Sequence, residues 1–375
     1  GRLGVNVQLI RHGKYKSAGE MFTKSKSSPE NREQYQRMVD SMWESMSESI
    51  AQSRELSVEA LDDAINNLKL NLPQDFVECG LVDELLTKNE LEDKLAVLAV
   101  KDSFDEVSLI PFADYVANLV PPFNAKQQIA IIYADGEIID GSQKTAVAGD
   151  RFASIIAGVR ADSTVKAVVL RVNSPGGSVL ASEKIKNELD LLQKDKPVVA
   201  SYGEYAASGG YWISNGSNVI FTDATTLTGS IGVFGMIPDF SKTAKDVLHI
   251  GVESVNSHKH GDMFGLMRPF DQSEFNYMTR SIENIYDRFV SIVSDNRSLT
   301  RERVDEIAQG RVWTGADALP IELVDEIGTL EDAVNYAASI AGDPDLGNWS
   351  VCGYPSPQTM MEKVLEMFYG SSDEN

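Results

Sequence analysis

A single serine within a run of small residues is the first candidate for chemistry in this sequence. Ser208 follows an apolar run over 197–202, which predicts a buried strand, and it precedes Gly209-Gly210. A serine at a strand-to-helix junction can present its hydroxyl outward while the next backbone N–H faces the reacting atom. Gly209 permits that close approach because glycine has no Cβ. The same stretch equally fits a helix that starts with Ser208 as its N-cap.

A second glycine-rich loop lies upstream of Ser208, after another apolar run. Pro175-Gly176-Gly177 follows a strand predicted over 165–172, and it precedes a helix predicted over 181–192. Such a turn can leave backbone N–H groups exposed for an oxyanion, although an ordinary strand-to-helix turn has the same composition. Together these segments predict one βαβ unit with both special loops at the carboxyl ends of strands, where open α/β sheets place their sites.

Composition excludes several other classes of function. The chain has 375 residues, is 42% hydrophobic and 24% charged, and has a net charge of −22. These fractions are ordinary for a globular protein, and the negative charge argues against nucleic acid as a partner. Only two cysteines occur, Cys79 and Cys352, and their spacing predicts neither a disulfide framework nor a zinc site. No P-loop, HExxH or helix-opening GxGxxG motif is found, so we expect no metal or cofactor.

The serine needs a base, and the histidines do not provide an obvious one. The four histidines are His12, His249, His258 and His260, and none lies beside a strand-end aspartate in a triad pattern. A Ser–Lys dyad is a known variant of the triad logic and remains open.

The elements that must position these residues can be predicted along the chain. A strand is expected over 1–10, an irregular loop over 11–28, and a long helix from Pro29 with Ser28 as its N-cap. In a second domain, the strand over 129–133 runs into Asp135-Gly136, a hairpin signal, and then into 138–139. Further helices are expected over 57–68, 73–79, 90–102, 151–162, 209–214, 271–296, 300–309 and 329–340, with a strand over 218–221, a linker at 121–122 and a tail from 342.

The chain also repeats itself. Residues 36–54 match residues 279–297 at a shift of 243 (297 − 54), and residues 79–85 resemble residues 322–327. The front of the chain therefore resembles the back half of a duplicated domain, yet nothing in it corresponds to residues 128–250. Because helices without their sheet would expose apolar faces, we expect a truncated tandem repeat. The predicted parts are 1–104 (first repeat), 105–127 (linker), 128–341 (second repeat) and 342–375 (tail).

Four motifs carry a resemblance to a known family, and they are distributed over nearly the whole chain. The motifs span 174–177, 206–212, 227–232 and 310–315. They resemble the signal peptide peptidase A family, also called protease IV, most closely its tandem bacterial form. The resemblance implies an α/β fold of the crotonase/Clp-protease type and a serine endopeptidase that degrades cleaved signal peptides and other apolar peptides. It also implies a homo-oligomeric bowl, a tetramer, at the outer face of the cytoplasmic membrane. No apolar run reaches the roughly 18–20 residues of a spanning helix, so we expect the family's membrane anchor to be absent from this chain.

The resemblance also implies roles for individual residues. Ser208 would be the nucleophile, Gly177 and Gly209 would supply the oxyanion N–H groups, and Ser230 would hydrogen-bond a lysine amine. In the tandem form that lysine comes from the first repeat, within a Gly-x-Tyr-Lys-Ser-Ala motif, and the matching residue here is Lys16.

A lysine base requires an unusual environment. A free lysine has a pKa of about 10.4 and is protonated at pH 7, but burial disfavours the charged form and lowers that pKa. Lys259 is the rival base, because it aligns with Lys16 at the same shift of 243 and lies on the same repeat as Ser208. Two other functions remain open: a crotonase-type acyl-CoA enzyme, which would not need Ser208, and an inactive family member that serves as a peptide-binding scaffold.

Overall fold

The computed structural model describes residues 3–118 and 125–356, and these residues form two compact units. The first unit joins the residues up to Met42 with those from Asn124 onward, and the second comprises Trp43–Phe123. These spatial units do not coincide with the predicted repeat boundaries, because residues 1–42 pack with the second repeat. All the candidate site residues belong to the first unit.

A mostly parallel sheet forms the centre of the first unit. Its main strand order is β10-β8-β6-β5-β2-β12, and β7 pairs with β6 and with β11. All of these pairs are parallel except β10 with β8. The strands are β2 (Gln127–Asp135), β5 (Val165–Ser174), β6 (Val198–Ala207), β7 (Val219–Thr222), β8 (Leu227–Gly229), β10 (Val312–Thr314), β11 (Glu326–Ile327) and β12 (Trp349–Tyr354). Because a parallel sheet is covered on both faces, its strands read as nearly continuous apolar runs, as the sequence showed.

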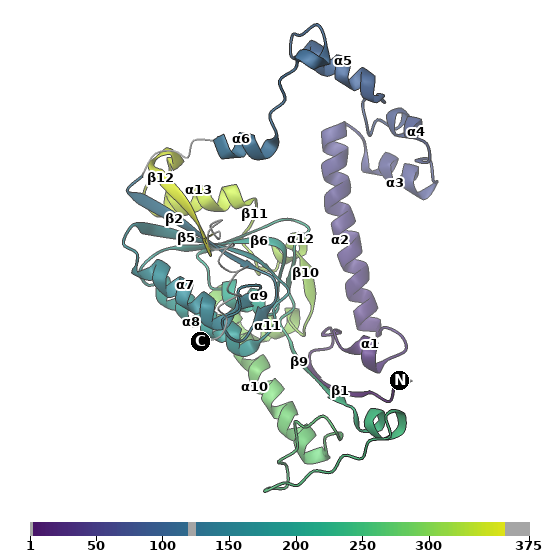
Figure 1. Cartoon of the computed structure of the whole chain (residues 1–375), viewed down its shortest axis with the longest axis vertical. Helices are drawn as coiled ribbons and strands as arrows, with labels where there is room; N and C mark the ends of the chain where they lie inside the picture. The colour runs from purple at the N-terminus through teal and green to yellow at the C-terminus, as the bar shows by residue number, and fades with distance from the viewer. Residues whose placement is uncertain (1–2, 119–124, 357–375) are drawn as a thin grey trace. The chain divides into compact units, whose positions relative to one another are not determined.

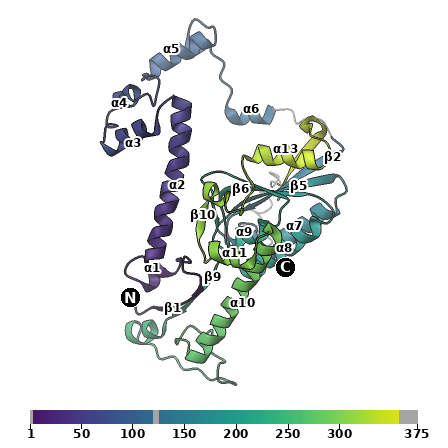
Figure 2. The ribbon, with the colours of Figure 1, turned by 180° about the vertical axis from the view of Figure 1, so that it is seen from behind.

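Helices cover both faces of this sheet (Figures 1 and 2). Ile132 and Leu170 pack in the same core as α7 (Gly149–Ala161) and α8 (Val179–Leu192). Their neighbours Ile131 and Val169 pack in a second core with α13 (Leu330–Ile340). Successive side chains of a strand point to opposite faces, so one apolar run supplies two cores. This arrangement confirms the expected α/β class.

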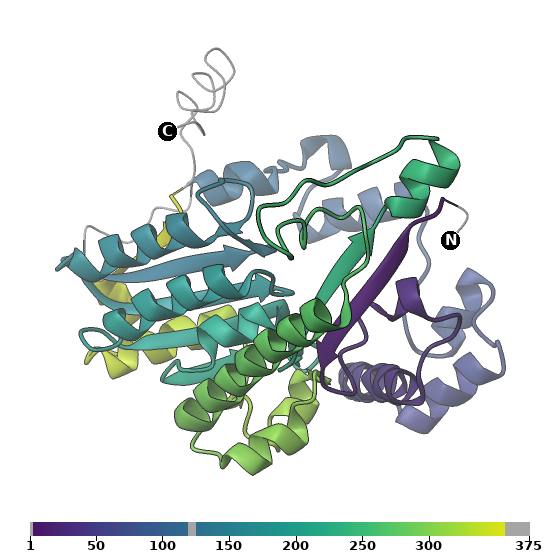
Figure 3. The same ribbon diagram turned by 90° about the horizontal axis from the view of Figure 1, so that it is seen from below.

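A two-stranded ribbon brings the start of the chain to the site. β1 (Asn6–His12) pairs antiparallel with β9 (Val233–Asp239), and Figure 3 shows the two strands side by side. The long helix α10 (Gln272–Arg297) packs against both strands. The remaining elements of this unit are α1 (Glu20–Thr23), β3 (Ile138–Ile139), β4 (Val147–Ala148), α9 (Gly209–Ser214), the π-helix η2 (Thr243–Val247), α11 (Arg301–Ile307), α12 (Gly315–Ala318) and η3 (Leu346–Asn348).

Two local expectations were wrong. The Asp135-Gly136 signal does not form a hairpin, because β3 pairs parallel with β4 and the Ile138 N–H donates to Gly176 O. The segment after 342 is not only a tail, because residues 349–354 add β12 to the sheet edge beside β2. Trp349 is buried there, so tertiary contact stabilises a strand whose sequence, WSVCGY, has no continuous apolar run to mark it.

All the regular secondary structure in the described residues of the second unit is helical. The helix α2 (Pro29–Arg54) begins in the first unit with Ser28 as its cap, whose Oγ accepts from the Asn31 N–H, and it ends in the second unit. The other helices are α3 (Val58–Asn66), α4 (Pro73–Glu78), α5 (Lys88–Leu98), η1 (Phe104–Glu106) and α6 (Phe112–Asn118). The α6 helix lies within the stretch 105–127 that was expected to be a linker. The proline pair at 121–122, which indicated that linker, lies outside the described residues. Within residues 3–118 and 125–356, none of the helices has the length and apolar character needed to cross a membrane.

Candidate active site

Ser208 lies between β6 and α9 in a backbone conformation that is rare for a residue with a side chain. Its φ is +54° and its ψ is −117°. The surroundings hold this strained geometry, because the Ser208 N–H donates to Gly229 O and its carbonyl accepts from the Trp212 N–H. The Ser208 side chain does not cap α9, although the residue occupies the N-cap position. The hydroxyl is therefore directed to another partner.

That partner is Lys16, which lies 192 residues earlier in the chain. Its Nζ lies 3.2 Å from Ser208 Oγ, 2.9 Å from Ser230 Oγ and 3.2 Å from Ser230 O. The side chain is buried, and this burial lowers the pKa of Lys16 from 10.5 to about 8. By contrast, Lys259 is exposed in the loop that precedes α10 and makes no hydrogen bond with Ser208 within the described residues.

Ser230 joins the lysine to a third segment of the chain. It also has a left-handed backbone, with a φ of +48°, and its N–H donates to Arg311 O at 2.7 Å. The Ser230 hydroxyl can donate to Gly310 O at 3.4 Å while it accepts from Lys16 Nζ. A neutral amine bonded in this way retains a lone pair that can take a proton from Ser208.

The two predicted glycine loops lie against each other. A Cβ on Gly176 would lie 2.4 Å from Gly209 N, and a Cβ on Gly177 would lie 2.0 Å from Ile138 O. Ser174 Oγ accepts from the Gly176 N–H and so supports the turn. Gly209 is the first residue of α9, so its N–H has no acceptor within that helix. The structure thus brings Gly177 and Gly209 together beside Ser208.

A groove of about 790 Å³ runs past these groups. Its wall includes Lys16, Ser208 and Ser230, and its apolar or aromatic lining residues include Tyr35, Met38, Tyr205, Leu227 and Phe234. A smaller pocket of about 60 Å³ adjoins Ser208 and Gly209, with Trp212 and Phe289 packed together in its wall at 4.6 Å between ring centroids. The site can therefore accept an extended apolar chain with one side chain in the small pocket.

No pattern in the sequence identifies the residues that support the lysine loop. Arg11 donates to Lys16 O at 2.7 Å and to Glu20 Oε1 at 3.1 Å, and Glu20 also accepts from the Ser28 N–H. Burial alone would raise the pKa of Glu20, but the hydrogen bonds from Ser28, Lys24 and Arg11 outweigh it and hold the pKa at about 2. The charged residues of this loop are visible in the sequence, but their partners are not.

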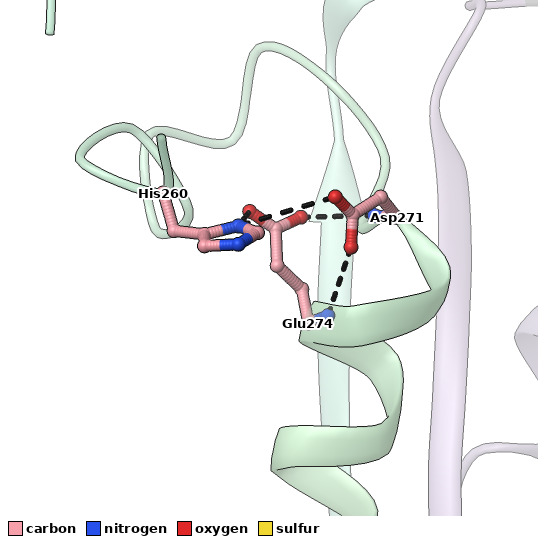
Figure 4. Close-up of side chains that lie close together, drawn as sticks. All are labelled: His260, Asp271 and Glu274. Atoms are coloured by element: carbon pink, nitrogen blue, oxygen red, sulfur yellow. Dashed lines mark hydrogen bonds and ion pairs between the residues drawn. The ribbon is translucent and has the colours of Figure 1, made fainter. Parts of the chain in front are cut away.

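One cluster of metal-ligand types is present in the described part of the chain, and it is already neutralised by an arginine. His260, Asp271 and Glu274 lie close together at the start of α10 (Figure 4). Both carboxylate oxygens of Glu274 accept hydrogen bonds from Arg268, and one of them also accepts from the Asp271 N–H. The Nδ1 atom of His260 lies 2.8 Å from Glu274 Oε1, and the Asp271 side chain caps α10. The hydrogen bonds from Arg268 hold the pKa of Glu274 at about 2 against the effect of burial. We assign this cluster to fastening the preceding loop onto α10.

The chain is similar in sequence to known proteases over most of its length. The chain is 39% identical to Protease 4 of Haemophilus influenzae over 90% of this chain and 57% of that protein. It is 29% identical to the chloroplastic serine protease SPPA of Arabidopsis thaliana over 97% of this chain and 55% of that protein. The chain thus spans little more than half the length of these relatives.

Among solved structures, a ClpP1 mutant of Listeria monocytogenes aligns with 54% of this chain and 94% of its own, with a TM-score of 0.38 and 13% identity. The family "Peptidase family S49" matches residues 1–101 and 190–342, which is more than half of the chain. We conclude that this chain belongs to peptidase family S49.

Proposed function

We propose that this chain is a serine endopeptidase in which Ser208 is the nucleophile and Lys16 is the general base. The observation that carries the proposal is the 3.2 Å separation of Lys16 Nζ and Ser208 Oγ, with the amine buried and its pKa lowered to about 8. A base works best when its pKa lies near the operating pH, and burial brings this lysine close to that range.

The proposed reaction proceeds in two stages. Ser208 Oγ bonds to the carbonyl carbon of a peptide as its proton passes to Lys16 Nζ, and the negative charge develops on the carbonyl oxygen. In this proposal the N–H groups of Gly177 and Gly209, whose loops pack against each other beside Ser208, donate to that oxygen. The C–N bond then breaks, Lys16 returns the proton to the leaving amine, and an acyl-enzyme remains. Water, deprotonated by Lys16, then attacks the ester carbonyl carbon. The C–O bond to Ser208 breaks, and Lys16 returns the proton to Ser208 Oγ.

The proposed substrates are extended apolar peptides, including cleaved signal peptides. The support is the apolar and aromatic lining of the groove together with the small pocket beside Ser208. An extended peptide can add main-chain hydrogen bonds in such a groove while alternate side chains enter pockets. We also propose, on the strength of family membership, that the protein acts as a homo-oligomer at the outer face of the cytoplasmic membrane.

The test is hydrolysis of a fluorogenic apolar peptide by matched variants. Ser208→Ala and Lys16→Met are expected to lower kcat/KM by at least 10³-fold, because each removes a member of the dyad. Ser163→Ala and Lys14→Met are the controls, since Ser163 is an exposed turn residue and Lys14 is an exposed lysine in the same loop as Lys16. Retained turnover by Ser208→Ala would end the proposal.

Two further measurements separate the alternatives. A fluorophosphonate probe is expected to label the wild type at Ser208, whereas an inactive scaffold would not react. Lys259→Met is expected to keep full activity, because that side chain is exposed. If Lys259→Met were inactive and Lys16→Met active, the base would have been assigned to the wrong lysine.

A further inference from the structure

We propose that the segment Gln309-Gly310-Arg311 positions the general base, and that Gly310 is the positioning residue that holds Lys16 against Ser230. This inference rests on the proposed role of Lys16 as the base. Gly310 lines the groove but packs on the stem and backbone of Lys16 and not on its amine, so we expect its effect on the chemistry to pass through the lysine.

The first observation is that this segment is bonded to both sides of the site. The Tyr15 N–H donates to Gln309 O at 2.9 Å, which ties the segment to the lysine loop. The Gly310 N–H donates to Ile231 O at 2.8 Å, and the Ser230 N–H donates to Arg311 O at 2.7 Å. Three consecutive residues therefore fix the spacing between the backbones that carry Lys16 and Ser230.

The second observation is that there is no room for a side chain at position 310. Gly310 has a φ of +76°, and a Cβ there would lie 2.6 Å from Lys16 Cβ and 2.7 Å from Lys16 N. On the other side, a Cβ on Gly232 would lie 2.6 Å from Gly310 Cα and 3.3 Å from Lys16 Cδ. The lysine stem thus packs directly on the bare backbone of Gly310.

The third observation is that the segment is itself held from outside the site. The Gln309 side chain donates to Asp305 at 2.7 Å and to Tyr286 Oη at 3.2 Å, which ties it to α11 and α10. The Arg311 guanidinium lies over the ring of Trp313 in β10, at 4.3 Å from its centroid, and on its other contact it lies 4.9 Å from the ring centroid of Tyr15 in the lysine loop. A side chain added at Gly310 would therefore push the lysine loop away more readily than it would push the segment back.

The consequence concerns the protonation of the base. Lys16 loses its proton near pH 8, well below the usual pH for a lysine, because its amine is buried in contact with Ser230 and Ser208. If the loop moves outward, water reaches the amine, the charged form becomes more stable, and the pKa rises towards its ordinary value of 10.5. A change at Gly310 should thus alter the pH dependence of the reaction as well as its rate.

The experiment measures kcat/KM against pH for Gly310→Ala. For the wild type, kcat/KM is expected to rise with pH, and the midpoint of this rising limb of the pH profile should lie near pH 8, where the base loses its proton. In Gly310→Ala this limb is expected to move up by at least one pH unit. Its activity would then be about tenfold lower than that of the wild type at pH 7 and would recover most of the loss near pH 10. A purely structural role would lower the rate by the same factor at every pH.

The matched control is Gly80→Ala. Gly80 has a φ of +75°, nearly the same as Gly310, but a Cβ there would meet only Leu56 Cδ2 at 3.4 Å. This variant carries the same strain of a left-handed alanine without touching the lysine loop, so its pH limb is expected to stay at the wild-type position.

Gly232→Ala provides an independent test that does not depend on a left-handed alanine. Its added Cβ would press on Gly310 and approach Lys16 from the other side, so we expect a smaller shift of the limb in the same direction. Circular dichroism spectra establish which variants are folded, and Gly232→Ala decides the matter if Gly310→Ala does not fold. A limb unchanged in the folded variants would overturn the inference while leaving the peptidase proposal intact. Failure of the peptidase proposal would instead appear as activity that survives in Ser208→Ala.

Discussion

At the scale of single residues, the site depends on a lysine that is kept uncharged. Within the described residues, the Lys16 amine has no carboxylate partner; it hydrogen-bonds Ser208 and Ser230 and lies 5.9 Å from the centroid of the Phe234 ring. A nearby carboxylate would favour the ammonium form and raise the pKa, which would defeat its use as a base. Hydroxyl and carbonyl partners instead orient the amine without stabilising its charge strongly.

This arrangement predicts that Lys16 costs stability at neutral pH. The pKa is about 8 in the folded chain and 10.5 in the unfolded one, so between these values the unfolded chain binds more protons and stability rises with pH. Below pH 8 the full penalty applies, and the shift corresponds to ~3 kcal/mol. Lys16→Met loses the bonds to Ser230 but escapes this penalty, so we expect it to be more stable than the wild type at pH 7 by about 1–2 kcal/mol.

Urea unfolding of the wild type and Lys16→Met at pH 7 and pH 10 measures this difference, with Lys14→Met as the control. The advantage of Lys16→Met is expected to shrink at pH 10, because the free-energy cost of deprotonating the lysine on folding falls as the pH approaches the unfolded pKa of 10.5. An advantage of the same size at both pH values would show that burial does not shift the Lys16 pKa.

At the scale of elements, the two parts of the chain reuse the same sequence of helices. The helices α2 and α10 each have 26 residues and each end at an arginine, Arg54 and Arg297, related by the shift of 243. Arg54 bonds Gly80 O and Asp83, and Arg297 bonds Glu322 O and Asp325. The helices α5 and α13 each have 11 residues and begin with a threonine capping box. These parallels support the proposal that the chain derives from a duplicated domain.

The two arginines nevertheless should differ in their effect on stability. The Arg297 side chain is 8% exposed, and its partner Asp325 also accepts from the Ile220 N–H of β7, whereas Arg54 is 28% exposed and Asp83 is 82% exposed. Removing one member of a buried pair leaves an uncompensated charge, while an exposed pair contributes little. We expect Arg297→Ala to lower the free energy of unfolding by about 3 kcal/mol and Arg54→Ala by less than about 1 kcal/mol.

Thermal unfolding followed by circular dichroism provides the comparison, since both variants remove the same side chain from equivalent positions. Equal losses would mean that the difference in burial between the two pairs has no energetic weight.

At the scale of the whole molecule, the net charge of −22 should influence which peptides arrive fastest. The exposed carboxylate of Glu137 lines the groove and adds negative charge beside the site. Long-range attraction raises the rate of association with cationic ligands and is screened by salt.

For two apolar peptides that differ only in flanking residues, we expect opposite salt effects. The kcat/KM of a peptide flanked by lysines should fall several-fold between about 10 mM and 300 mM salt, and that of a peptide flanked by glutamates should rise. Stopped assays at constant pH give both values. If the two peptides responded to salt in the same direction, electrostatic steering would not contribute to substrate choice.

Sequence alone determined the α/β class and the family, because these depend on local patterns. Apolar runs such as 165–172 predict buried strands from their own composition, and glycine pairs after strands mark loops where the backbone must come close to something. The motifs around Gly177 and Ser208 could therefore be recognised without knowing what they contact. The edge strand β12 could not, because its support is the neighbouring strand β2.

Only the tertiary structure decided which lysine meets Ser208, and what keeps that lysine neutral. Lys16 and Ser208 are 192 residues apart, and Lys259 also fits the repeat spacing, so the motif around Lys16 could favour that lysine but could not show that it reaches the serine. The pairing of β1 with β9 and the packing of Lys16 on Gly310 bring the amine to the serine. A lowered pKa is a property of the surroundings, and those surroundings exist only when distant segments are folded together.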